Sequence, residues 1–152
     1  MRGTRSGFTV IELAMVCVIV GTVSAIALPH FSGFRANSAV RSVKQTTAAM
    51  LASARASAVQ RGWKTSLVRA GDSLKVVADS SGTKVQLVPW YSAYSVQGVK
   101  LSPSPTRDTI SFDPRGYGSG LSSLEVIRFS RSTIKDSVCV TKLGKVEWSC
   151  SL

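Results

Sequence analysis

The sequence contains few of the residues that carry out chemistry. Histidine occurs once, as His30, and the chain has 8 acidic residues against 19 lysines and arginines. Because His30 borders a long apolar run, the rest of the chain cannot build a catalytic triad around histidine. The carboxylates form neither the HExxH pattern of a zinc protease nor the calcium loop of an EF-hand. We therefore expect no enzyme, no metal site and no cofactor.

Cysteine is also scarce, with three in the chain. Cys17 lies within the apolar run and is interpreted as a small buried apolar residue. Cys139 and Cys150 enclose ten residues near the C-terminus. They could close a small loop if this part of the chain crosses into an oxidising compartment, and we prefer a disulfide to two free thiols. The sequence does not give the Cα separation that the bond needs.

Acidic residues are also few, so the formal net charge is +11. The positive residues are spread along the whole chain. Such a field attracts polyanions such as nucleic acid or anionic lipid. A highly charged, soluble surface without a particular ligand would have the same composition. Charge alone leaves both interpretations open.

The most distinctive feature that is present is an apolar run over residues 8–28, whose only formal charge is Glu12. As a helix the run would be about 30 Å long, which matches the hydrocarbon core of a bilayer. We therefore predict a transmembrane segment. A cleaved secretory signal with its cut after Ala27 is the alternative, and Arg2 and Arg5 in front of the run support it. The length of the run and the carboxylate inside it argue against that alternative.

The stretch GFTVIEL, Gly7 to Leu13, together with the apolar run behind it, resembles the class III leader motif of type IV pilins and pseudopilins. The resemblance implies that prepilin peptidase cuts between Gly7 and Phe8, which removes residues 1–7, and that the new N-terminal Phe8 is N-methylated. It also implies a single-pass protein of the bacterial inner membrane, with a cytoplasmic N-terminus and a periplasmic C-terminal domain. Pro29 stands where pilins commonly carry a proline that kinks the helix.

Glu12 matches the glutamate at the fifth mature position of that family. A lone carboxylate in a bilayer or a helix bundle needs a cation, and the nearest one is the α-amine freed at Phe8, in the same chain or in a neighbour. Pairing with the neighbour would set the axial register of an incoming subunit, so we interpret Glu12 as an assembly residue. A glutamate that snorkels to the interface is the alternative, but it explains neither Gly7 nor the length of the run.

The helical pattern continues over residues 29–62 with Gly62 as the stop signal, so one helix of about 80 Å is expected over residues 8–61. Its apolar and small residues recur at helical spacing: Ala36, Val40, Val43, Met50, Ala54 and Ala58. From residue 63 onward, short apolar runs between turn residues predict strands at 65–68, 74–78, 85–88, 109–112, 124–129, 138–141 and 146–148. LSPSPTRD and PRGYGSG are interpreted as loops.

These patterns predict an α+β protein. A long N-terminal helix, transmembrane over residues 8–28 and amphipathic over 29–62, would pack on a small antiparallel β-sheet or sandwich formed by residues 63–152. This arrangement is the pilin fold that the N-terminal resemblance implies.

The stretches ISFDPRGYGSG, residues 110–120, and VCVTKLGKVEWSC, residues 138–150, resemble the GspH/FimT family of minor pilins and minor pseudopilins. That resemblance implies a low-copy subunit near the tip of a type IV pilus or a type II secretion filament, where it helps to start assembly. The implied partners are other pilins or pseudopilins, inner-membrane assembly proteins, prepilin peptidase and membrane lipid. The sequence does not decide between the pilus and the secretion system.

Some members of this family bind DNA through arginines in a GRxR-like turn of the C-terminal hairpin. Here Lys145 replaces the first arginine, and Glu147, which would repel phosphate, replaces the second. The last strands are nevertheless basic, so a DNA-binding minor pilin used in DNA uptake is the alternative function. Its candidate contacts are Arg128, Arg131, Lys135, Lys142 and Lys145.

Overall fold

The structure is a computed structural model that describes residues 7–104, 108–121, 124–148 and 150, with the side chains of residues 27–32 and 103–104 left out. Residues 1–6, which belong to the predicted leader, lie outside this description. The chain divides into two compact units, Met1–Arg35 and Ala36–Leu152. Each unit is described by itself.

Helix α1 covers Val10–Arg61 and ends directly before Gly62, which confirms the predicted helix except for its first two residues. The helix is continuous through Pro29, whose side chain lies outside the described part, so the kink stays a prediction. For the predicted span at residues 8–28 the result is negative: within the described ranges, no helix is long and apolar enough to cross a membrane.

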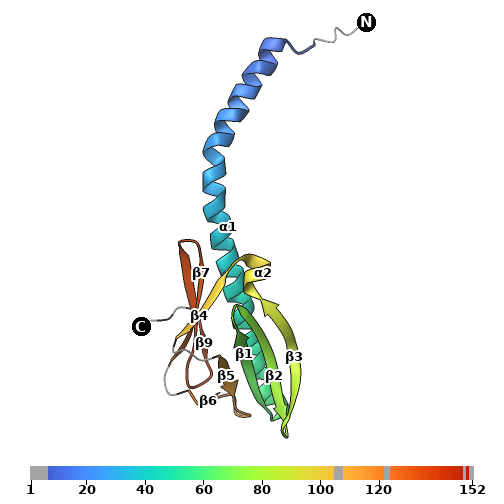
Figure 1. The fold of residues 1–152 in the computed structure, drawn as a ribbon, viewed down its shortest axis with the longest axis vertical. Helices are drawn as coiled ribbons and strands as arrows, with labels where there is room; N and C mark the ends of the chain where they lie inside the picture. The colour runs from blue at the N-terminus through green and yellow to red at the C-terminus, as the bar shows by residue number, and fades with distance from the viewer. Residues whose placement is uncertain (1–6, 105–107, 122–123, 149, 151–152) are drawn as a thin grey trace, which may run out of the picture. The chain divides into compact units, whose positions relative to one another are not determined.

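The second unit contains two antiparallel sheets (Figure 1). The first has the strand order β3-β2-β1-β5-β6, with β1 at Lys64–Ala70, β2 at Ser73–Ser80, β3 at Thr83–Ser92, β5 at Thr109–Phe112 and β6 at Gly118–Ser119. The second has the order β4-β7-β8-β9, with β4 at Lys100–Ser104, β7 at Glu125–Arg131, β8 at Ile134–Val140 and β9 at Val146–Glu147. A short helix, α2 at Ala93–Gln97, connects β3 to β4.

The part of α1 from Ala36 onward and both sheets share one hydrophobic core. All six residues that the spacing predicted for the buried helix face are buried, and Val43, Leu51 and Ala54 are completely inaccessible. The first sheet contributes Leu67, Leu74, Val76, Ile110 and Phe112, and the second contributes Leu101, Ile127, Phe129, Val138 and Val140. Burial of each large apolar side chain is worth about 1.5–3 kcal/mol, so this helix face holds the two sheets together.

Each predicted strand overlaps an observed one, but the structure contains three elements that the sequence analysis missed: α2, β4 and β6. The interpretation of LSPSPTRD as a loop is wrong for its first half, because residues 101–104 belong to β4. Pro103 pairs with Ile127, and β4 is an edge strand of the second sheet. An edge strand tolerates proline because the missing N–H can point away from the sheet.

Candidate functional site

The N-terminal end of α1 is closed by Thr9 and Glu12. The backbone N–H of Glu12 donates to Thr9 Oγ1 at 3.3 Å, while Thr9 donates its backbone N–H and its hydroxyl to Glu12 Oε2, each at 3.4 Å. This reciprocal pair is a capping box, in which an N-cap threonine and a glutamate three residues later satisfy backbone N–H groups that the helix leaves open. The sequence analysis missed this role, although T-x-x-E within GFTVIEL is its signal.

The capping box places the Glu12 carboxylate beside the N-terminal end of α1. Thr9, whose N–H donates to the carboxylate, directly follows Phe8, and the positive end of the helix dipole favours a negative charge there. Gly7 and Phe8 precede the helix, and both are exposed. The three residues that the sequence analysis selected for cleavage and assembly therefore lie at or just before the first turn of α1.

Every residue from Gly7 to Ile26 is exposed in the isolated chain. Eleven large apolar side chains lie in this stretch, with exposed fractions between 46% and 86%. They are Phe8, Val10, Ile11, Leu13, Met15, Val16, Val18, Ile19, Val20, Val23 and Ile26. Cys17 is a free, exposed cysteine, so its interpretation as a buried residue is wrong for the chain alone.

Cys139 and Cys150 form a disulfide with a Cα–Cα separation of 5.8 Å. Cys139 is completely buried in β8, opposite Glu147 of β9. The bond therefore ties the end of the chain to the last long strand of the second sheet.

Two turns and α1 meet at a point that we call the turn junction: Arg55, residues 113–118 and residues 141–145. Arg55 Nε donates to the Gly116 carbonyl at 3.0 Å, and the Gly118 N–H donates to the Lys142 carbonyl at 2.9 Å. A Cβ on Gly144 would lie 2.1 Å from the Gly116 oxygen. The first part of PRGYGSG, residues 114–117, is therefore a hydrogen-bonded turn that holds the C-terminal hairpin against the helix, whereas the loop interpretation is wrong for Gly118 and Ser119, which form β6.

The five candidate DNA contacts do not form one cluster. Arg128 and Lys135 are exposed and share one face of the second sheet, because Arg128 pairs with Ser137 and Lys135 pairs with Ser130. Arg131 belongs to the opposite face by the same register. Lys142 lies in the turn after β8, two residues beyond the last residue of that strand.

Lys145 is the remaining candidate contact, and a carboxylate already neutralises part of its charge. Its Nζ lies 3.1 Å from Glu147 Oε1. The glutamate that breaks the GRxR-like motif therefore pairs with the lysine that replaces its first arginine. This pairing lowers the attraction that the turn would exert on phosphate.

Two solved structures resemble this fold, both of the type IV minor pilin FimU from Pseudomonas aeruginosa strain PAO1. The crystal form in space group P21 superposes with a TM-score of 0.61 and 14% identity, over 73% of this chain and 88% of that chain. The form in space group P65 gives a TM-score of 0.59 and 14% identity, over 72% and 92%. This chain has a type IV pilin-like fold. No protein-family model and no curated protein sequence matches it.

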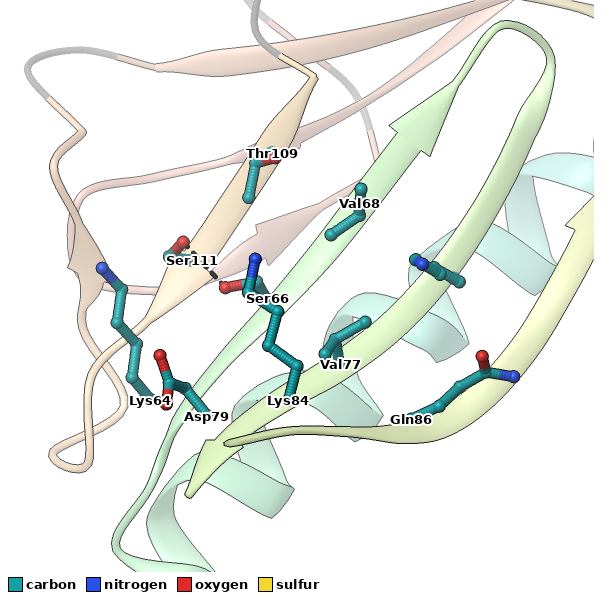
Figure 2. Close-up of a pocket in the computed structure, with 10 residues that line it drawn as sticks. Lys64, Ser66, Val68, Val77, Asp79, Lys84, Gln86, Thr109 and Ser111 are labelled. Carbon is teal, nitrogen blue, oxygen red and sulfur yellow. Dashed lines mark hydrogen bonds between the residues drawn. The ribbon is translucent and has the colours of Figure 1, made fainter. Parts of the chain in front are cut away.

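The pilin-like domain also carries a hollow on the outer face of its first sheet, which the sequence analysis did not select (Figure 2). Strands β1, β2, β3 and β5 line it, and its volume is about 480 Å³. Three lysines border it: Lys64, Lys75 and Lys84. The period-two alternation of β1 is the signal that could have found it, since Lys64, Ser66 and Val68 alternate with the buried Thr65 and Leu67.

Proposed function

We propose that this chain is a minor pilin or pseudopilin, anchored in the bacterial inner membrane by residues 8–28 and incorporated into a type IV pilus or a type II secretion filament near its tip. There it takes part in starting assembly and has no chemistry of its own. The observation that carries the proposal is the exposed apolar stretch from Phe8 to Ile26 on a chain with a pilin-like fold.

The exposed stretch needs a cover that the isolated chain does not supply. Burial of the eleven large side chains is worth on the order of 20 kcal/mol in total, which exceeds the stability of a typical domain. Lipid tails before assembly and neighbouring helices in the filament would both provide this cover. Exchange between the two environments is what a subunit extracted from a membrane into a filament requires.

Processing by prepilin peptidase would create the cation that Glu12 needs. A cut between Gly7 and Phe8 frees an α-amine one residue before Thr9, whose N–H already donates to Glu12 Oε2. In our proposal the capping box holds the carboxylate at the helix start, and the N-methylated amine of an adjacent subunit then pairs with it. This pair sets the axial register, while the C-terminal domain lies on the periplasmic side.

DNA uptake gains no specific support from the geometry. The candidate cations are divided between two faces of the second sheet and the hairpin turn, and Lys145 is paired with Glu147. We therefore propose the structural role and not DNA uptake.

The charge of Glu12 can be separated from its capping role by two matched substitutions. Glu12→Gln removes the charge but keeps a side chain that also forms capping boxes, whereas Thr9→Ala removes the capping hydroxyl and keeps the charge. The variants are expressed with the prepilin peptidase and partner pilins, and sheared filaments are probed for the chain. We expect Glu12→Gln to reduce incorporation at least tenfold at unchanged membrane level, and Thr9→Ala to reduce it less than twofold.

Two outcomes would contradict the register role. In the first, Glu12→Gln enters filaments as well as the wild type. In the second, Thr9→Ala is as defective as Glu12→Gln, which would show that the helix start matters and the charge does not.

A further inference from the structure

The hollow on the outer face of the first sheet has a strong positive charge. Its lining contains three lysines, Lys64, Lys75 and Lys84, and one carboxylate, Asp79. The strand register places Asp79 opposite both Lys64 and Lys84. Among the described residues, none of the three lysines forms an ion pair. Asp79 Oδ1 is already engaged, because it accepts the N–H of Gly82 at 2.9 Å. The hollow therefore carries an excess of two positive charges, which an anionic ligand would balance.

The floor of the hollow combines neutral hydrogen-bonding groups with the apolar side chains of Val68 and Val77. The hydroxyls of Ser66 and Ser111 share a hydrogen bond of 2.9 Å across β1 and β5, and Thr109 and Gln86 add a hydroxyl and an amide (Figure 2). Hydroxyl and amide groups both donate and accept hydrogen bonds. Such a floor matches a ligand that is rich in hydroxyl groups.

An exposed aromatic ring borders the hollow. Trp90 of β3 is 47% exposed, and the Nζ of Lys75 lies 4.5 Å from the centroid of its ring. Lys75 is held there by a cation–π contact, which places its charge next to a flat apolar surface. A sugar ring can stack its apolar face on such a surface while its hydroxyls and carboxylate reach polar groups nearby.

Three other occupants fit less well. A second copy of this chain would be repelled, since each copy carries a net charge of +11. Nucleic acid is disfavoured because the described residues that line the hollow include no arginine for bidentate phosphate contacts. Across the hollow, an acidic peptide would find the backbone groups of the interior strands β1 and β2 engaged with their neighbours, so its backbone could pair only with the free side of the edge strand β3.

We infer that the outer face of β1, β2, β3 and β5 binds an acidic polysaccharide, a chain of sugar rings that carries carboxylates. The lysines Lys64, Lys75 and Lys84 attract the carboxylates, the hydroxyl floor hydrogen-bonds the ring hydroxyls, and Trp90 contacts the face of one ring. This surface shares no residue with the helix start or with the turn junction.

The test uses the full chain in detergent micelles with three probes: polygalacturonate, neutral dextran and a single-stranded oligonucleotide. The triple variant Lys64→Gln, Lys75→Gln, Lys84→Gln is compared with the control Lys100→Gln, Lys135→Gln, Lys142→Gln, which removes the same charge from exposed positions elsewhere. We expect polygalacturonate to bind the wild type, the triple variant to lose at least tenfold in affinity and the control to lose less than threefold. Dextran should bind at least tenfold more weakly than polygalacturonate.

Lysine acetylation of the wild-type protein provides a second readout that does not depend on the folding of a variant. Bound polygalacturonate should protect Lys64 and Lys84 from acetylation more than Lys135 and Lys142, as measured by mass spectrometry. Equal loss of affinity in the two triple variants, equal protection of all four lysines, or absence of polygalacturonate binding would each overturn the inference. Tighter binding of the oligonucleotide, lost in the hollow variant, would reassign the hollow to nucleic acid.

Discussion

Replacement of Gly144 by alanine tests whether the turn junction holds the C-terminal hairpin in place. Gly144 has φ +73, a backbone conformation that costs a residue with a Cβ about 1–2 kcal/mol. The added Cβ would also lie 2.1 Å from the Gly116 oxygen, which belongs to backbone and cannot swing away like a side chain. One of the two turns must therefore move by about 1 Å, since ordinary contacts are well above 3 Å.

That movement would disturb two further hydrogen bonds, from Arg55 Nε to the Gly116 carbonyl and from the Gly118 N–H to the Lys142 carbonyl. Each is worth about 1 kcal/mol. Together with the backbone cost, we expect Gly144→Ala to lower the free energy of unfolding by about 3–4 kcal/mol. Urea unfolding of the full chain in micelles, followed by tryptophan fluorescence, measures this loss.

Gly71→Ala is the matched control. Gly71 also has a positive φ, +58, but an added Cβ would meet nothing within 4 Å. It should therefore show only the backbone cost of about 1–2 kcal/mol. If the two variants lose the same free energy, the contact between the two turns contributes nothing and our description of the junction is incorrect.

Three further substitutions test the domain. Replacing Cys139 and Cys150 together by alanine opens a loop with a sequence separation of 11 and should cost about 3 kcal/mol in the urea assay, with a similar loss on reduction of the wild type. Leu51→Ala, at a completely buried position of α1, should cost about 2–5 kcal/mol by thermal unfolding, against less than 1 for exposed Val59→Ala. Lys44→Met should cost about 1 kcal/mol by breaking its 2.7 Å ion pair with Asp136. Unchanged stability in any of the three would contradict the contact concerned.

The helix and its buried face could be predicted because their signals are local. Ala36, Val40 and Val43 recur every three or four residues, and Gly62 directly follows the end of the helix. The predicted strands were recognisable because short apolar runs are bounded by turn residues. These elements needed no knowledge of what lies beside them.

The missed elements depend on partners that are distant in the sequence. Strand β6 has only two residues and exists because Gly118 and Ser119 pair with β5. Strand β4 contains Pro103, and a proline predicts a loop unless its position at a sheet edge is known. Helix α2 has five residues, too few for a periodic pattern, although Ser92 caps its start.

The candidate sites also differ in whether their residues are close together or far apart in the sequence. Gly7, Phe8 and Glu12 are neighbours in the sequence, so their motif could be recognised directly. The hollow requires Ser66 and Ser111 to meet across β1 and β5, and they are 45 residues apart. The alternation within β1 indicates that Lys64, Ser66 and Val68 share one face, but only the strand register brings Ser111 beside Ser66.

The identity of the first residue in assembled filaments tests the central proposal most directly. Filaments sheared from cells that express this chain with its prepilin peptidase are digested, and mass spectrometry reads the N-terminal peptide. We predict that this peptide begins at Phe8 and carries an additional methyl group. A peptide that begins at Leu28, or a filament subunit that retains residues 1–7, would contradict the proposal.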